Sequence, residues 1–264
     1  MMGAMTESTL TTTPADSATE TVAPRGGMVM VARIYFLILA CIGTASFLVS
    51  CYLSMTAIGN GGALNGLVFT LSYFTIWSNI FVAIVTWTLV ANPRRDGNVF
   101  RWLRLTSLVM ITITGLVYAL VLAKDAHPTG LGVYTNLGFH YIAPWASVLG
   151  FLLFGPRPRF TMNLIPKMLV IPVLWLTYTL IHGAFMTTPP PLAPETVLGQ
   201  AQHWYPYPFI NVNDPAPLLP GVSLEGYAGV GVNIVVIVIL GLLFGLMFVG
   251  LDRVLSGRRQ PTPL

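Results

Sequence analysis

Hydroxyl, amide and imidazole side chains are the groups in this chain that could do chemistry, and several lie inside long apolar segments. Residues 71 to 81 read LSYFTIWSNIF, which is apolar except for closely spaced polar side chains. At about 100° per residue these positions share one side of a helix. They are Ser72, Thr75, Ser78 and Asn79, with Thr86 two turns further along. We expect such a stripe to face a partner helix or a site.

The chain has only four histidines, and two of them, His140 and His182, fall inside apolar segments. The other two, His127 and His203, fall in connecting segments. A helix rises about 1.5 Å per residue, which places Thr75 about 12 Å, His140 about 9 Å and His182 about 6 Å from the same end of their helices. We therefore expect these three side chains to line one pocket.

A buried hydroxyl beside an imidazole is the minimum equipment for nucleophilic acyl transfer. The imidazole takes the hydroxyl proton and later returns a proton to the leaving group. In this interpretation Thr75 is the nucleophile and His140 the base. The competing interpretation is structural, because a membrane threonine often bonds its own helix carbonyls and an intramembrane histidine can simply bond across helices.

The composition is that of an integral membrane protein. Hydrophobic residues make up 55% of the 264 residues and charged residues 8%, and the mean hydropathy is +0.74. Five long apolar runs, and a sixth that is shorter and contains Pro144, predict an all-α bundle of six transmembrane helices in one domain. The expected spans are 34–53, 67–91, 102–123, 138–154, 168–186 and 228–251.

The positive charges are distributed very unequally. Of the 13 Lys and Arg, 12 fall in the N-terminal region, the second and fourth loops and the C-terminal region, and only Lys124 falls on the other side. The positive-inside rule then predicts a multi-pass protein of the cell membrane with both termini cytoplasmic. This distribution explains the net charge of +4 without a nucleic-acid partner. The lack of charged residues in the middle of the spans argues against a proton pump, a voltage sensor or an ion-coupled transporter.

Three regions follow from this pattern. Residues 1–27 are rich in Thr, Ser, Ala and Pro and are expected to form a disordered cytoplasmic tail. Residues 28–255 form the transmembrane domain, and residues 256–264 form a second cytoplasmic tail.

The outer loop 187–227 is unusually long and carries nine prolines together with the cluster HWYPYPF at 203–209. Loops of this length are commonly functional or disordered. Trp204 and Tyr207 are typical of an interfacial aromatic belt. The alternative is a lid over a membrane-embedded site, in which both side chains would contact the substrate.

Several short motifs, in order, make the chain resemble the androgen-induced protein family of six-span membrane proteins. They are FTIWSN at 74–79, NLGFH at 136–140 leading into Pro144, His182, and WYPYPF at 204–209. Members of that family are intramembrane threonine hydrolases that cleave fatty acid esters of hydroxy fatty acids. The resemblance implies that Thr75 and His140 are the catalytic pair and that a lipid ester within the bilayer is the substrate, with no cofactor and no metal.

The chain departs from the animal members in two places. Ser78 stands where they carry an acidic residue, and the outer loop is longer and richer in proline.

The implied mechanism also assigns roles to neighbouring side chains. A Thr-bound acyl intermediate needs donors for its oxyanion, and Asn79 and Asn136 lie one turn from Thr75 and His140 respectively. Both are equally typical of interhelical hydrogen bonding. His182 would orient His140 or bind the released carboxylate, unless it is a packing residue.

Two other classes of protein remain open on the sequence. His140 and His182 could be paired axial ligands of a haem, as in membrane b-type cytochromes. Alternatively, the bundle could bind or transport a lipid or another small molecule without any reaction. The second class predicts that Thr75→Ala leaves binding intact.

Overall fold

The computed structural model describes residues 26–57, 62–155, 159–185 and 203–257. Within these residues the regular structure is helical and no β-strand occurs. Six helices are long and apolar enough to cross a membrane, as the composition predicts. They are Gly26–Thr56, Phe74–Ala91, Asn98–Asp125, Leu131–Phe154, Leu164–Phe185 and Gly226–Ser256.

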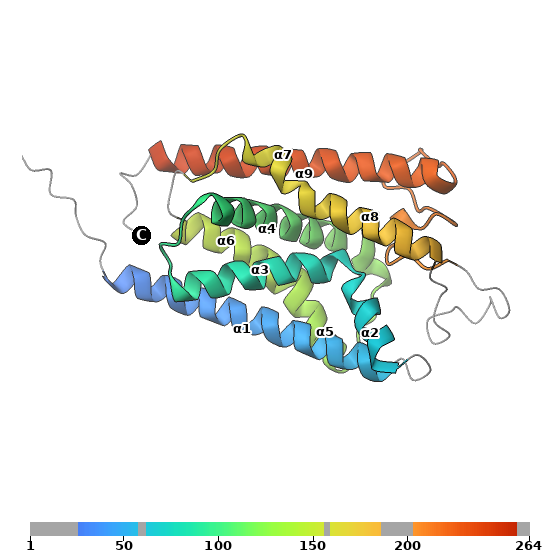
Figure 1. Ribbon diagram of the computed structural model, residues 1–264, viewed down its shortest axis with the longest axis horizontal. Helices are drawn as coiled ribbons and strands as arrows, with labels where there is room; N and C mark the ends of the chain where they lie inside the picture. The colour runs from blue at the N-terminus through green and yellow to red at the C-terminus, as the bar shows by residue number, and fades with distance from the viewer. Residues whose placement is uncertain (1–25, 58–61, 156–158, 186–202, 258–264) are drawn as a thin grey trace, which may run out of the picture.

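The helices run lengthwise beside one another, and both ends of the described chain lie at the same end of the bundle (Figure 1). We call this the terminal end, where α1 (Gly26–Ala57) begins and α9 (Gly226–Gly257) stops, and the opposite one the distal end. At the centre is α4 (Asn98–Val117), which is buried continuously from Arg104 to Gly115. It packs against α3, α6 and α9, so it forms the core of the bundle.

The outer faces of the bundle remain apolar. Large hydrophobic side chains on the flanks of the helices are exposed, among them Leu48, Ile84, Leu153, Leu174 and Leu243. A water-soluble helix would be polar on such a face, whereas a helix in lipid can stay apolar. This pattern is compatible with a multi-pass membrane protein.

The second span differs from its prediction. The expected helix 67–91 is divided into α2 (Gly62–Leu71) and α3 (Phe74–Ala91), and α2 begins five residues before the expected start of the span. Ser72 and Tyr73 form the break, and Tyr73 has an extended backbone.

Two tryptophans satisfy the carbonyl groups that this break exposes. Trp77 Nε1 donates to the Leu71 carbonyl at 2.7 Å, and Trp175 Nε1 donates to the Ser72 carbonyl at 3.0 Å. Unpaired carbonyls would be costly in an apolar bundle. As a result, Thr75 lies in the first turn of a new helix.

The fourth span begins at Leu131, earlier than the expected 138, and its middle turn is unusual. The π-helical turn η3 (Gly138–Ile142) separates α5 (Leu131–Leu137) from α6 (Ala143–Phe154). Pro144 has no N–H group to donate to the carbonyl of His140, and the helix takes the form of a π turn at this point.

Gly115 of α4 permits the π turn to pack closely against the core. A Cβ atom at this position would lie 2.7 Å from Pro144 Cβ.

The third span contains a second π turn, η1 (Tyr118–Leu122), followed by the 3₁₀ turn η2 (Ala123–Asp125).

The fifth span consists of α7 (Leu164–Met168) and α8 (Val170–Phe185). The chain after it, from residue 203, folds back into the bundle through the 3₁₀ turn η6 (Pro208–Ile210). Phe209 and Ile210 are buried, and Asn233 Nδ2 of α9 donates to the Phe209 carbonyl at 2.9 Å. Part of the expected outer loop, around Phe209 and Ile210, is therefore packed into the bundle, whereas residues 219–225 are exposed.

The expected region boundaries shift slightly. The first tail was expected to end at residue 27, but Gly26 and Gly27 already belong to α1, and α9 reaches Gly257. The remainder of the tails, 1–25 and 258–264, and the part 187–202 of the outer loop lie outside the described residues.

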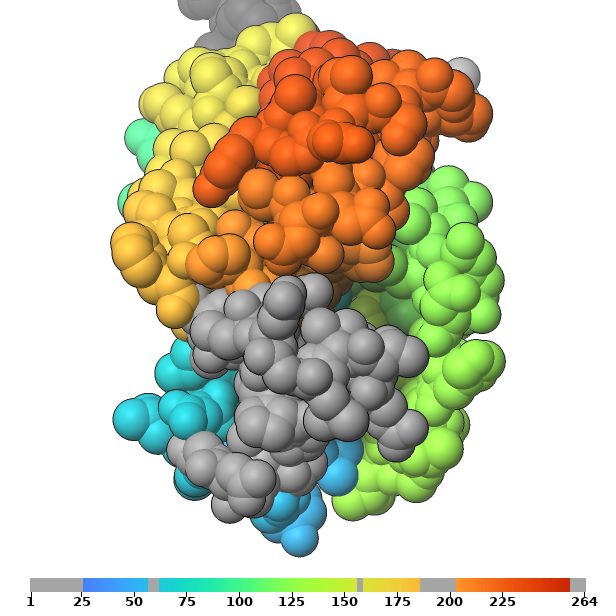
Figure 2. All heavy atoms as spheres, turned by 90° about the vertical axis from the view of Figure 1, so that its right-hand side faces the viewer, coloured from blue at the N-terminus to red at the C-terminus, as the bar shows by residue number. Residues whose placement is uncertain are grey.

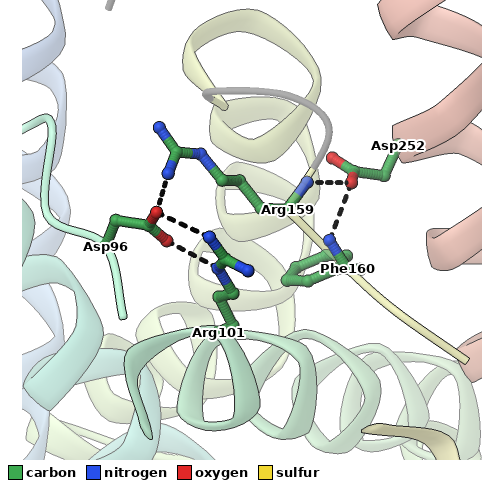
Figure 3. A network of polar contacts seen from close by, with 5 residues as sticks. All are labelled: Asp96, Arg101, Arg159, Phe160 and Asp252. Atoms are coloured by element: carbon green, nitrogen blue, oxygen red, sulfur yellow. Dashed lines mark hydrogen bonds and ion pairs between the residues drawn. The ribbon is translucent and has the colours of Figure 1, made fainter. Parts of the chain in front are cut away.

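A polar network joins two loops and the helices α4 and α9 at the terminal end (Figure 3). Arg101 donates to Asp96 from Nε and Nη2 at 2.7 and 2.8 Å, and Arg159 pairs with the same carboxylate. Asp252 of α9, 1% exposed, accepts from the backbone N–H groups of Arg159 and Phe160 at 2.5 and 2.8 Å. The network ties α9 to the loop before α7 and to the loop between α3 and α4.

Candidate active site

Thr75 occupies the second position of α3, where backbone N–H groups have no partner within the helix. Its N–H donates instead to the Tyr207 hydroxyl at 3.1 Å. Its Oγ1 lies 3.2 Å from the same hydroxyl and 3.4 Å from His140 Nε2. The structure therefore brings together Thr75 and His140, which lie 65 positions apart in the chain.

His140 lies in the π turn η3, and its ring is held on two sides. Nδ1 is 3.0 Å from Asn136 Oδ1, and the ring stacks on Tyr118 with centroids 3.8 Å apart and planes 11° apart. An amide oxygen only accepts hydrogen bonds, so Nδ1 carries the proton in this contact. Nε2 is then unprotonated and can accept the proton of Thr75.

The hydroxyl and imidazole hydrogen bonds around Thr75 can form one series, in which each group donates its proton to the next from Tyr207 to Asn136. The Tyr207 oxygen accepts the Thr75 N–H, which leaves the Tyr207 proton for Thr75 Oγ1. Thr75 Oγ1 in turn directs its proton to His140 Nε2, and Nδ1 of that ring donates to Asn136. Nucleophile, base and orienting group thus occur in the order found in catalytic triads.

Tyr207 lies in the segment between the fifth and sixth spans and is buried. Burial raises the pKa of its hydroxyl to about 12, against hydrogen bonds from Thr75 and Phe74 that lower it. The phenol therefore keeps its proton near neutral pH and can donate a hydrogen bond beside Thr75.

The expected oxyanion donors serve other purposes. Asn79 Nδ2 donates to the carbonyls of Thr75 at 2.8 Å and Phe139 at 3.4 Å, which ties α3 to the π turn. Asn136 presents its oxygen to His140. The donor next to Thr75 Oγ1 is instead the Tyr207 hydroxyl.

Other members of the polar stripe have structural roles. Ser78 Oγ bonds the Thr75 carbonyl at 2.9 Å and lies 2.8 Å from Thr114 Oγ1 of α4. Thr86 Oγ1 bonds the Val82 carbonyl of its own helix. The structural interpretation of the stripe is therefore correct for these two residues.

His182 does not join the pair. It lies on α8, stacks on Tyr178 at 5.0 Å, and lines a separate pocket with Ile181 and Phe185. The expectation of one pocket for three residues rested on depth alone, and depth does not determine which way a helix face points. Both ring nitrogens of His140 contact the protein, so the structure does not show the paired arrangement expected of haem ligands.

Trp204 packs over the break between α2 and α3. Its ring centroid lies 4.9 Å from that of Phe69 and 6.0 Å from that of Tyr73. It covers the start of α3 without contacting Thr75 or His140 in the structure, whereas Tyr207, three residues later, bonds Thr75 directly.

Two cavities meet at Thr75. The first, which we call the apolar chamber, is a cavity of about 100 Å³ between α4, α7, α8 and α9. It extends toward Val109, Met168 and Gly241.

The second cavity, which we call the vestibule, has a volume of about 390 Å³ and is lined by His140, Asn136, Thr70 and Ser54 among others. It lies toward the distal end, where α5 and the segment after residue 203 border a hollow (Figure 2). Among the described residues, Thr75, Leu122 and Tyr207 line both cavities. The Thr75 hydroxyl therefore lies on the wall between them.

No metal site is evident in the described part of the chain, where His, Cys, Asp and Glu form no group of three.

Tyr118 is a residue of the site that the sequence did not single out. Its position near the end of the third span, at the depth of His140, could have indicated that it lies beside His140.

Comparison with known proteins adds no relative from which a role could be transferred. No family model, curated protein or solved structure matches the chain.

Proposed function

We propose that this chain is an intramembrane hydrolase of lipid esters in which Thr75 is the nucleophile and His140 the base. The observation that carries the proposal is the hydrogen-bonded series Asn136, His140, Thr75 and Tyr207 at the junction of an apolar and a partly polar cavity. The motifs that resemble the androgen-induced protein family support the same pair. They also favour fatty acid esters of hydroxy fatty acids as substrates.

The reaction proceeds in two halves. His140 Nε2 takes the proton of Thr75 Oγ1, which attacks the ester carbonyl carbon. The tetrahedral intermediate collapses as the bond to the alkoxy oxygen breaks, and His140 returns the proton to the leaving alcohol. Water, deprotonated by His140, then attacks the Thr75 acyl ester, and the carboxylic acid leaves as Thr75 recovers its proton.

Tyr207 has a separate role in this scheme. Its hydroxyl lies 3.2 Å from Thr75 Oγ1, so an oxyanion formed on the attacked carbonyl comes within reach of the phenol. The positive end of the α3 dipole, at Phe74 and Thr75, adds to this stabilisation.

The proposed location is the cell membrane, with both termini cytoplasmic. The site lies in the distal half of the bundle and would then open toward the outer leaflet.

A fluorophosphonate probe tests the nucleophile in detergent-purified protein, with intact mass as the readout. We expect one adduct on Thr75 in the wild type and in the control Thr86→Ala, and none in Thr75→Ala or His140→Ala. Thr86 is a suitable control because it lies on the same helix and bonds only its own helix carbonyls. Equal labelling of all four folded proteins, or no labelling of the wild type, would instead favour a lipid-binding protein without chemistry.

A further inference from the structure

We infer that the apolar chamber binds the acyl chain of the ester and that the vestibule binds the leaving alcohol. This inference rests on the proposed function, and it specifies which half of the substrate the protein selects. It follows from the side of Thr75 on which each chemical group lies.

The position of the base determines the position of the leaving group. His140 lines the vestibule and is not among the residues that line the chamber. The same imidazole that deprotonates Thr75 must protonate the departing alkoxy oxygen, so this oxygen has to lie on the vestibule side. The two other substituents of the tetrahedral carbon are the oxyanion and the acyl chain, so the acyl chain extends away from His140. The cavity on that side of Thr75 is the chamber.

The linings agree with this assignment. Apart from Thr75 and Tyr207, Thr114 is the one hydroxyl residue among the described residues of the chamber, and its Oγ1 already contacts Ser78. A polar alcohol would find no hydrogen-bond partner there and would be costly to bury, whereas a hydrocarbon chain needs none.

The vestibule offers polar partners instead. Thr70 is 2% exposed, and its Oγ1 has no hydrogen-bond partner within the described residues. It lines the vestibule together with the hydroxyl residues Ser50 and Ser54. These groups suit the polar part of an alcohol, and the water that releases the acyl group can reach His140 from this side.

The chamber has a definite depth. Val117 of α4 packs at the level of Tyr207, and Val109, further along α4, lines the far end. Eight residues of helix correspond to about 12 Å. Gly241 of α9 borders this far end, where an added Cβ would lie 3.5 Å from Ile113 Cδ1 and 4.0 Å from Val109 Cγ1. A larger side chain at Gly241 can enter the chamber without an initial clash and would shorten it.

The test compares Gly241→Leu with the control Gly250→Leu. Gly250 also lies on α9 but is exposed, and a Cβ there meets nothing within 4 Å. We would measure kcat/KM for p-nitrophenyl esters of increasing acyl length, and for acetate esters of increasing alcohol length. Gly241→Leu should lower kcat/KM for the longest acyl chains about 100-fold, leave short acyl chains near the wild-type value, and leave the alcohol series unchanged. Gly250→Leu should match the wild type in both series.

A second readout does not need hydrolysis. A fatty acid with a photoreactive diazirine near its methyl end should label residues around Met168 and Val109 in the wild type and in Gly250→Leu, but not in Gly241→Leu. If esters are hydrolysed while Gly241→Leu and Gly250→Leu give equal acyl profiles and equal labelling, the chamber assignment is overturned and the hydrolase proposal stands. If labelling follows the expected pattern but no ester is hydrolysed, the chamber holds fatty chains and the hydrolase proposal fails.

Discussion

In the proposed mechanism, the reactivity of Thr75 depends on its two neighbours at hydrogen-bond distance. A threonine hydroxyl is a weak nucleophile, so it needs a base aligned on its proton and a donor beside the developing oxyanion. His140 lies on one side at 3.4 Å and Tyr207 on the other at 3.2 Å. The long contact to His140 is of the kind that tightens when a substrate is bound.

Tyr207→Phe tests the donor. This change removes the hydroxyl beside Thr75 and keeps the ring, which stacks on Phe209 at 5.2 Å. We expect kcat for ester hydrolysis to fall about 100-fold with little change in KM, because an oxyanion donor acts mainly in the transition state.

Tyr205→Phe is the matched control, because Tyr205 lies in the same segment and its hydroxyl faces Tyr227. It should keep wild-type kcat. Equal losses in the two variants would mean that the segment is only a structural cover.

In the proposed mechanism Asn136 is a positioning residue, and its variants test the tautomer of His140. Asn136→Leu removes the acceptor for Nδ1–H, so kcat should fall about 10- to 100-fold because the wrong tautomer is populated. Asn136→Asp restores an acceptor and should recover most of the activity, measured with the same ester. An Asp variant as inactive as the Leu variant would contradict the orienting role.

At the scale of elements, the sequence predicts the spans well and the breaks within them poorly. Apolar length is a local property, so six spans could be identified from composition. The break at Ser72 and Tyr73 contains neither Gly nor Pro, and one of its supports, Trp175, lies 103 positions away in the chain. No local pattern indicates a partner at that distance.

Because local sequence patterns do not indicate distant partners, only some residues of the candidate site could be predicted. Thr75 and His140 could be matched by depth, and the structure places them in contact. His182 matched in depth as well, but α8 presents it to a different pocket, because depth contains no information on the direction of a helix face. Tyr207 could be named only as part of an aromatic cluster, because its bond to Thr75 joins residues 132 positions apart.

Gly183 of α8 holds the segment that carries Tyr207, and it provides an element-scale prediction. A Cβ at this position would lie 2.3 Å from Tyr205 Cε1 and 2.9 Å from the Trp204 carbonyl oxygen. Gly183→Ala should therefore displace the segment, lower stability by about 1–3 kcal/mol, and reduce hydrolysis as Tyr207 moves from Thr75. Thermal unfolding in detergent and an ester assay measure both effects.

Gly43→Ala on α1 is the control, since a Cβ there meets nothing within 4 Å. It should match or slightly exceed wild-type stability because alanine favours a helix. If Gly183→Ala behaves in the same way, α8 does not position the segment.

At the scale of the whole molecule, the terminal end is held by polar contacts and the distal end contains the site. Asp252 accepts hydrogen bonds from two backbone N–H groups while nearly fully buried (Figure 3). Asp252→Ala leaves these donors unpaired and should lower the free energy of unfolding by about 1–3 kcal/mol.

Asp125→Ala is the comparison for Asp252→Ala. Asp125 pairs with Lys124 at 3.9 Å, and both side chains are largely exposed, so its loss should cost less than about 1 kcal/mol. Thermal unfolding in detergent compares the two. Equal effects would mean that the network at the terminal end contributes little to stability.

The orientation of the bundle decides which leaflet supplies the substrate. Arginine-rich loops are retained on the cytoplasmic side, and 12 of the 13 Lys and Arg belong to the terminal end by sequence. In a variant with Cys41→Ser and Cys51→Ser, a single Asp125→Cys should react with a membrane-impermeant maleimide on intact cells. A single Asn98→Cys, at the start of α4, should react only after permeabilisation. The reverse pattern would place the vestibule on the cytoplasmic side, and esters of the inner leaflet would then be the accessible substrates. With the expected pattern, the vestibule opens outward, so a labelled ester added to intact cells should be hydrolysed without first crossing the membrane.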